Sequence, residues 1–179
     1  GKYGSCCTEI DLWEANKMAT AYTMHSCSPG EQTRCDGTDC GDNGEDRFKG
    51  FCDKNGCDIQ PHRLGVHNFF GPGSDFQIDS TKPVTVTTQF ITNDGSDHGK
   101  LVEVKQFYQQ DGKTIEHPSY TVNGKQHNTI NDDFCSDWVA TTQDGTNFLE
   151  KGGLDAVEKA IDAGVVLVMS LWDDHYANM

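Results

Sequence analysis

Basic residues are scarce in this chain, with 14 Lys and Arg against 28 Asp and Glu, so the formal net charge is −14 over 179 residues. A surface of that sign repels the phosphates of nucleic acids and the headgroups of anionic membranes. Long apolar runs are also missing, because the longest, 165–169, is no longer than a strand. We therefore expect no nucleic-acid partner, no membrane association and no transmembrane helix.

A recognisable signal peptide and a clear metal-binding group are missing as well. The N-terminus lacks the apolar core of a secretory leader, and the eight cysteines do not group as zinc ligands. Four residues separate Cys35 from Cys40, and four separate Cys52 from Cys57, whereas the ligands of structural zinc sites are grouped more tightly. Their Asp-, Gly- and Asn-rich surroundings favour disulfide-stapled surface loops. We expect no metal or other cofactor, and a secreted, extracellular protein folded in an oxidising compartment.

Hydrophobic periodicity predicts an all-β sandwich with one short helix. The helix is expected at 154–163, where apolar residues recur at helical spacing. Asp111-Gly112 predicts a tight hairpin turn. The segments 26–65 and 117–150 are expected to be loops, because they are rich in turn residues or polar and irregular. Strands are expected at 8–13, 84–91, 101–110, 113–116 and 165–172, the last of them buried.

Three carboxylates and a tryptophan fall within six positions of the first expected strand: Glu9, Asp11, Trp13 and Glu14. Strand alternation places Glu9 and Asp11 on one face, whereas Glu14 joins them only if a β-bulge inserts one residue. A helix would set Glu9 and Glu14 about 140° apart, so it could not bring them together. Paired carboxylates across a scissile bond are what glycoside hydrolysis requires. The alternative is chance clustering in an acidic chain, with Asp11 a solvated strand residue.

The sequence around these acids closely resembles the active-site signature of glycoside hydrolase family 7, a family of secreted cellulases. The resemblance rests on GSCCTEIDLWEAN at 4–16, FFGPGS at 69–74, TTQF at 87–90 and GVVLVMSLWDD at 164–174. It implies a curved jelly-roll (concanavalin-like) β-sandwich. Because catalytic modules of the family are more than twice as long, it also implies that residues 1–179 are the central part of one module, with N-terminal and C-terminal portions missing.

The resemblance implies a role for each acid. Glu9 matches the nucleophile of the family, Glu14 the general acid/base, and Asp11 the aspartate that orients the nucleophile. In a retaining glycosidase the two catalytic carboxyls lie about 5–5.5 Å apart, which leaves no room for a water between them, so one attacks the anomeric carbon directly. The expected activity is hydrolysis of β-1,4-glucan (cellulose) by double displacement, with retention of configuration.

Four further residues are implied to bind substrate: Trp172, His25, Arg47 and Asp58. Trp172 matches a tryptophan that stacks on a sugar ring, which suits the apolar face of a pyranose; the alternative is a core tryptophan. His25 matches a histidine on the leaving-group side of the cleft, although a lone histidine can be purely structural. Arg47 and Asp58 match residues at the leaving-group and product sugars, and the alternative is ordinary surface charge.

The segment 41–51 favours the cellobiohydrolase subtype, because endoglucanases of the family lack most of it and cellobiohydrolases keep it as a loop over the cleft. The expected product is cellobiose, released from chain ends. Asn43 and Gly44 stand where an aromatic residue is often found, which leaves Tyr176 without a partner across the cleft, and Asn55 replaces a common aspartate. We expect these departures to weaken closure of the loop over the cleft and binding of the product. They do not involve the three acids.

The resemblance also implies three disulfides and a truncation. The implied pairs are Cys27–Cys52, Cys35–Cys40 and Cys57–Cys135. Cys6 and Cys7 match cysteines that pair with partners far upstream, which this chain lacks, and adjacent cysteines rarely bond to each other. A chain cut in this way leaves strand edges unpaired, so we do not assume that it folds alone.

Three alternatives stay open. The first is an endo-acting β-1,4-glucanase of the same family. The second is a non-catalytic glycan-binding module with the same sandwich fold. The three converging acids argue against it, because such a module does not need them. The third is a calcium-binding module built on aspartates whose spacing does not fit an EF-hand loop, namely Asp36, Asp39, Asp42 and Asp46. In the favoured interpretation the protein is a monomer whose partner is cellulose or a cello-oligosaccharide.

Overall fold

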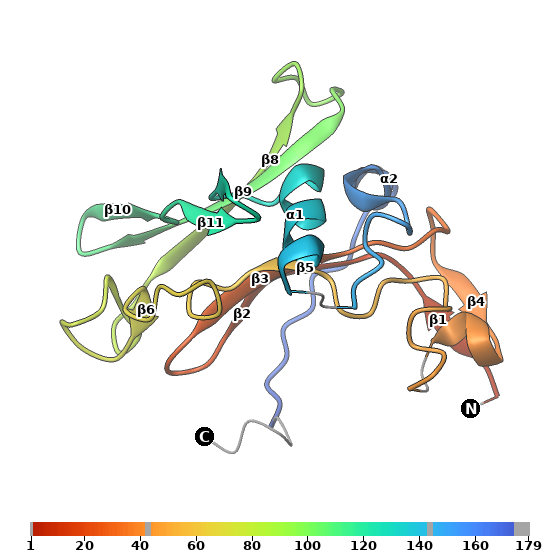
Figure 1. The fold of residues 1–179 in the computed structure, drawn as a ribbon, viewed down its shortest axis with the longest axis horizontal. Helices are drawn as coiled ribbons and strands as arrows, with labels where there is room; N and C mark the ends of the chain where they lie inside the picture. Colours follow the sequence, from red (N-terminus) through yellow and green to blue (C-terminus); the bar gives the residue numbers. More distant parts are fainter. Residues whose placement is uncertain (1, 42–43, 143–144, 174–179) are drawn as a thin grey trace.

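Two facing three-stranded sheets form the centre of the computed structural model, which describes residues 2–41, 44–142 and 145–173 (Figure 1). The first sheet has the order β2-β3-β5 and the second the order β10-β9-β8, with every neighbouring pair antiparallel. Their strands are β2 (Glu9–Ala15), β3 (Thr20–His25), β5 (Cys57–Ile59), β8 (Thr85–Thr92), β9 (Leu101–Gln110) and β10 (Lys113–Glu116). The Tyr22 hydroxyl donates to the Val104 carbonyl at 3.4 Å, so β3 and β9 face each other across the core.

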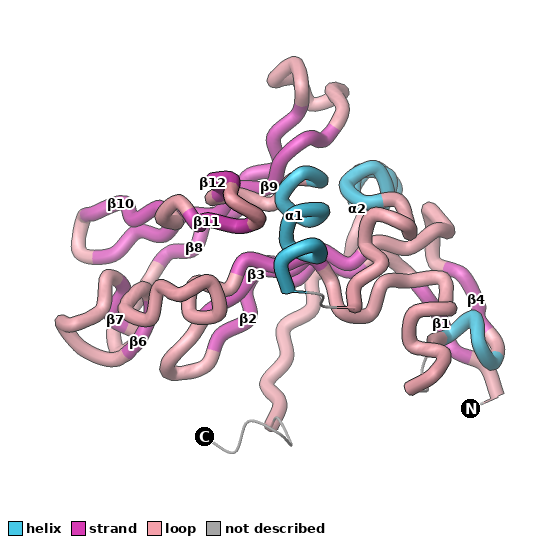
Figure 2. The backbone as a smooth tube through the Cα atoms, viewed as in Figure 1, coloured by secondary structure: helices cyan, strands magenta, loops and turns pink. Residues whose placement is uncertain are grey.

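Shorter strand pairs and helices surround these sheets (Figures 1 and 2). The pairs are β1 (Gly4–Cys6) with β4 (Thr33–Cys35), β6 (Phe70–Gly71) with β7 (Ile78–Asp79), and β11 (Tyr120–Val122) with β12 (Lys125–His127). The helical elements are η1 (Gly37–Cys40), α1 (Asp132–Thr142) and α2 (Gly153–Ala163). Within the described ranges, no helix has the length and apolar character needed to cross a membrane.

Most of the predicted strands are confirmed to within one or two residues. β9 and β10 have the predicted bounds, β8 is displaced by one residue, and α2 begins one residue before the predicted helix. Asp111 and Gly112 take φ values of 50° and 75°, as a two-residue turn that matches the strand twist requires. Over its described residues, the segment 26–65 is mainly loop, as predicted, with the short β4, η1 and β5 as its regular elements.

The prediction of one helix and of an irregular segment at 117–150 is wrong, because this segment contains β11, β12 and α1. Asn131 caps α1, since its Oδ1 accepts the backbone N–H of Phe134 at 2.8 Å, and Asp132 adds negative charge to the first turn. Phe134 and Trp138 lie one turn apart and are both buried. The polar residues around them conceal this helical spacing in the sequence.

The predicted buried strand at 165–172 is also not formed. The segment runs as a single extended chain away from the sheets (Figures 1 and 2), and the described residues give it no strand partner. The exposed fraction is 87% for Val166 and 101% for Leu171. An apolar run becomes a buried strand only where a neighbouring strand satisfies its backbone and other layers cover its side chains. The described elements provide neither.

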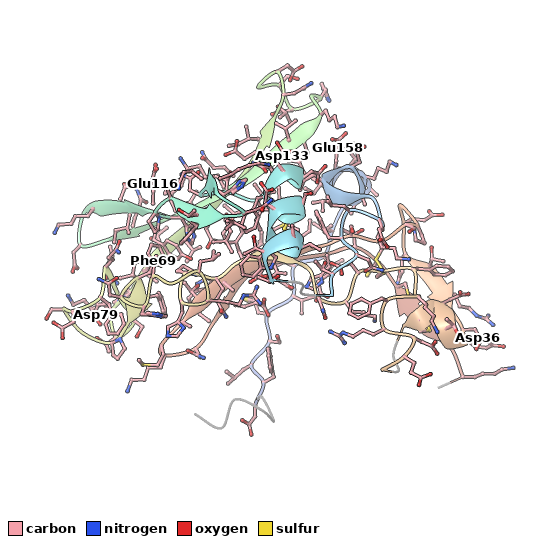
Figure 3. The ribbon with its side chains drawn as sticks, viewed as in Figure 1. Asp36, Phe69, Asp79, Glu116, Asp133 and Glu158 are labelled. Atoms are coloured by element: carbon pink, nitrogen blue, oxygen red, sulfur yellow. A yellow bond between two sulfur atoms is a disulfide. The ribbon has the colours of Figure 1, made fainter. Side chains whose placement is uncertain are left out.

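The main core lies between the two sheets and is closed by α1 and α2. Tyr22 and Met24 project into it from β3, and Val104 projects from β9; all three are fully buried. A second apolar cluster fills the end of the sandwich near β6, where the rings of Phe69 and Tyr108 meet edge to face at 5.6 Å (Phe69 is labelled in Figure 3). The first cluster holds β9 against β3, and the second packs Tyr108 of β9 against residues of β6 and β7.

The three implied disulfides are present as Cys27–Cys52, Cys35–Cys40 and Cys57–Cys135. The third joins β5 to α1 inside the main core, whereas the other two lie in a separate cluster near β4. Cys6 and Cys7 are not part of these disulfides: Cys6 is buried, with Sγ 3.8 Å from the carbonyl oxygen of Asp39, and Cys7 is exposed.

Candidate active site

The register between β2 and β3 places the three predicted acids on one face of the sheet. The cross-strand pairs are Glu9 with His25, Asp11 with Thr23, and Glu14 with Ala21. The β3 partners alternate with Tyr22 and Met24, which point into the core, so they share the opposite face. Residues directly opposite each other in an antiparallel pair lie on the same face. The three carboxylates therefore converge on the side of the sheet that faces away from the core.

A β-bulge makes this convergence possible. Leu12 and Trp13 both lie between Asp11 and Glu14, whereas only Tyr22 lies between their partners on β3, and the register shifts at this point. The extra residue reverses the parity of Glu14 and turns its side chain to the face of Asp11. The predicted bulge is confirmed.

His25 is held between two oxygen acceptors. Nε2 lies 3.1 Å from Oδ2 of Asp11, and Nδ1 lies 3.2 Å from the carbonyl oxygen of Asp53. A carbonyl oxygen only accepts, so Nδ1 carries a proton, and Nε2 donates to Asp11 when the ring is charged. Burial alone would lower the pKa of His25, but the hydrogen bond and the charge of Asp11 outweigh it and raise the pKa. His25 thus orients Asp11, while its contact with substrate stays a prediction.

Glu14 has the electrostatic surroundings of a general acid. Its Oε2 accepts a hydrogen bond from Oγ1 of Thr23 at 3.0 Å. Loss of water around the carboxyl and repulsion from Asp11 raise the pKa of Glu14, and they outweigh the opposing effects of Thr23 and His25. A raised pKa keeps the carboxyl protonated closer to neutral pH, which proton donation to a leaving group requires.

Glu9, Asp11 and His25 also bring three potential metal-ligand atoms within 4.8 Å of one another. When the ring of His25 is charged, however, Nδ1 donates to the Asp53 carbonyl and Nε2 donates to Asp11, so neither nitrogen has the free lone pair that a metal ligand must offer. We therefore assign no metal to this cluster.

Asp58 lies beside the acids on the same face. It is opposite Thr23 in the pairing of β3 with β5. Its carboxylate forms an ion pair with Arg63, whose guanidinium carbon lies 4.7 Å from the ring centroid of Trp138 on α1. Sequence reasoning missed Arg63 because a five-residue separation through a turn carries no periodic signal.

The guanidinium of Arg47 is bound by Asn55. Nε and Nη2 of Arg47 donate to Oδ1 of Asn55 at 2.8 and 2.6 Å, and Nη2 also reaches the Lys54 carbonyl at 3.2 Å. Nδ2 of Asn55 donates to the Gly145 carbonyl at 2.6 Å. Asn55 stands where the family resemblance implies an aspartate. It connects the loop that carries Arg47 to the segment at Gly145, 90 positions further along the chain.

The structure does not bring every predicted substrate residue to the acids. Trp172 is 67% exposed, at the end of the extended segment 165–172, so its stacking on a sugar stays a prediction. Asn43 and Tyr176 lie outside the described residues, so the expectation that Tyr176 lacks a partner across the cleft stays a prediction. Asp42 of the calcium alternative also lies outside them.

Comparisons with known proteins agree with this architecture. The sequence model of Glycosyl hydrolase family 7 matches residues 1–179. Exoglucanase GH7B of Limnoria quadripunctata is 49% identical over 181 residues, which cover 100% of this chain and 39% of that protein. A GH7 family cellobiohydrolase from Daphnia pulex superposes with a TM-score of 0.94 at 47% identity, covering 100% of this chain and 41% of that one. An endoglucanase I solved with cellobiose gives a TM-score of 0.77 at 35% identity, covering 89% of this chain and 37% of that one.

The fold and its clustered carboxylates define a β-sandwich of the glycoside hydrolase class. The chain belongs to glycosyl hydrolase family 7, which confirms the resemblance found in its sequence. The close superposition with the Daphnia enzyme confirms the predicted jelly-roll class. The chain spans about two-fifths of the length of these relatives.

Proposed function

We propose that this chain is the central part of a family 7 catalytic module and that the module is a retaining β-1,4-glucan hydrolase. The observation that carries the proposal is the bulged strand β2, which presents Glu9, Asp11 and Glu14 on one face beside His25. The chain covers 39% and 41% of the lengths of two relatives, which supports a module longer than this chain.

The chemistry follows from the surroundings of each acid. Glu14, with its raised pKa, donates a proton to the glycosidic oxygen while ionised Glu9 attacks the anomeric carbon, and the bond to the leaving sugar breaks. Glu14, now a carboxylate, then takes a proton from a water that attacks the same carbon and releases Glu9. Asp11, fixed by His25, keeps Glu9 in position. Two inversions at one carbon give net retention.

The substrate side of the proposal is cellulose or a cello-oligosaccharide, hydrolysed from chain ends to cellobiose. Arg47 and Asp58 would contact the leaving-group sugars and Trp172 the other side of the cleft. The greater identity with an exoglucanase and a cellobiohydrolase than with an endoglucanase supports this mode. Endo-acting hydrolysis is the second candidate, because the endoglucanase shares the same fold. We further propose that the protein is a secreted monomer, in line with its three disulfides.

The test of the chemistry uses the complete module with Glu9→Gln and Glu14→Gln, and Glu31→Gln as an exposed control outside the sheet. Both active-site variants should lose hydrolysis of cello-oligosaccharides by at least about a hundredfold while still binding them, and the control should not. Proton NMR of the first product should show the β-anomer. An α-anomer, or full activity of Glu9→Gln, would refute the mechanism; binding without any hydrolysis by the parent would favour the glycan-binding alternative.

The mode of action is tested on insoluble cellulose. An exo-acting enzyme releases soluble cellobiose with few new reducing ends left on the solid, whereas an endo-acting enzyme leaves many. A high proportion of insoluble reducing ends would favour the endoglucanase alternative without affecting the assignment of the acids.

A further inference from the structure

We infer that Gln106 of β9 is a positioning residue that holds the β2 bulge, and through the bulge the general acid, in place. The inference rests on the proposed function, because it concerns the role of Glu14. Gln106 is completely buried, and its side chain extends from the second sheet to the first. Its Nε2 donates to the carbonyl oxygen of Leu12 at 2.6 Å. Leu12 is one of the two residues that form the bulge.

Each polar atom of the Gln106 side chain has a partner. Besides Leu12, Nε2 donates to Oγ1 of Thr88 at 3.1 Å, and Oε1 accepts the hydroxyl proton of Tyr108 at 2.6 Å. The Tyr108 oxygen lies 3.4 Å from Oγ1 of Thr20 on β3. The amide therefore has one orientation that satisfies all of these partners, since exchanging its two ends would place its oxygen opposite the Leu12 carbonyl oxygen, and both of these atoms are acceptors.

The position of Leu12 decides where Glu14 points. If β2 ran without the bulge, Trp13 would pair with Ala21, and Glu14 would turn to the core side of the sheet. A bulge leaves an extra residue outside the regular ladder, so its backbone needs support from elsewhere. Gln106 gives that support to Leu12 from a strand more than 90 positions away, and it adds no charge beside the acids.

Gln110 provides a matched control on the same strand. It also points inward and is buried, but its Nε2 donates to the carbonyls of Asp79 and Pro83, and no hydrogen bond joins it to β2 among the described residues. Gln106→Met and Gln110→Met make the same chemical change at two buried sites. A general loss of stability should appear in both variants, whereas displacement of the bulge should appear only in the first.

The experiment uses the complete module and two substrates: a cello-oligosaccharide, whose leaving group needs protonation, and an aryl cellobioside with an acidic phenol, whose leaving group does not. For Gln106→Met we expect kcat on the oligosaccharide to fall on the order of tenfold to a hundredfold, with a much smaller loss on the aryl substrate. The alkaline limb of the pH profile should also move to lower pH, because a displaced Glu14 loses the surroundings that raise its pKa. Gln110→Met should keep both the substrate ratio and the pH profile.

Gln106→Glu, which keeps the shape of the side chain but not the two amide donors, gives a second measurement if the methionine variant does not fold. Circular dichroism confirms the fold of each variant before the kinetics. Equal losses on the two substrates, or behaviour like that of Gln110→Met, would overturn the inference. Failure of the proposed function looks different: Glu14→Gln itself would then retain activity on the oligosaccharide.

Discussion

Replacing Asn55 with aspartate tests how the loop that carries Arg47 is held in place. The wild-type amide uses both ends, because Oδ1 accepts two hydrogen bonds from Arg47 and Nδ2 donates one to the Gly145 carbonyl at 2.6 Å. Aspartate keeps the acceptor for Arg47 but has no proton for Gly145 at neutral pH. Asn55→Asp should therefore weaken the connection between the loop and residues 145–147.

The size of the effect follows from these contacts. Because the hydrogen bond to the Gly145 carbonyl is exposed, losing it costs about 0.5–1.5 kcal/mol, and a charged pair with exposed Arg47 returns about 0.2–1 kcal/mol. The net loss is up to about 1 kcal/mol, which raises the population of the detached loop up to about 5-fold.

Hydrogen exchange of the peptide that covers 44–51, measured in the complete module, checks this prediction. Exchange should accelerate by a similar factor in Asn55→Asp and not in Asn128→Asp, an exposed position on a different part of the chain. The acceleration should shrink below about pH 3.9, where a protonated carboxyl again donates to Gly145. Unchanged or slower exchange in this peptide at neutral pH would show that Asn55 does not hold the loop.

Four further predictions concern stability and metal dependence. The pKa of Asp137 is depressed to about 2, chiefly by hydrogen bonds from Asn123 and Lys125, with a smaller contribution from His127. Its contribution to stability is therefore present above about pH 3.9 and lost as the pH falls toward 2, so melting temperatures in this window should fall more steeply in the wild type than in Asp137→Asn. The raised pKa of His25 contributes stability below about pH 6.5 that is lost as the pH rises through the raised value, so His25→Gln should lower the melting temperature at pH 5.5 more than at pH 9. Removing Cys57–Cys135, with a sequence separation of 78, should cost about 4.5 kcal/mol in urea unfolding, against about 2 kcal/mol for Cys35–Cys40 with a separation of 5; equal losses would contradict the chain-entropy argument. EDTA should leave cello-oligosaccharide hydrolysis unchanged because charged His25 donates from both ring nitrogens and offers no lone pair to a metal, and a loss that calcium restores would revive the metal alternative.

The local features of the site could be predicted from the sequence. Strand alternation and the spacing of Glu9, Asp11 and Glu14 required a bulge, and the register with β3 contains it. The strand bounds of β9 and β10 followed from their alternation and from Asp111-Gly112. These features depend on neighbours within a few positions, which is the range over which residue patterns carry information.

The features that sequence reasoning missed depend on distant contacts. Asn131 caps α1, and Phe134 and Trp138 are buried in it, but this burial depends on the strands that α1 packs against, which its own sequence does not show. The segment 165–172 shows the reverse case, since its composition is that of a strand and no described strand accompanies it. The intrinsic preference of a segment makes a strand or helix possible, and contacts with other segments determine whether it forms.

The face that carries Glu9, Asp11 and Glu14 depends both on local sequence and on distant contacts. A bulge is a local irregularity, but its extra residue has no partner in the ladder and must be stabilised from another layer. Here the Leu12 carbonyl is bound by Gln106, and Gln106 is oriented by Tyr108, whose ring packs against Phe69 in the second apolar cluster. The sequence pattern therefore identifies the three acids. Packing between the two sheets supports the bulge that places their side chains on the same face of β2. We therefore expect a substitution in that packing to impair the proposed hydrolysis while every acid remains in the sequence.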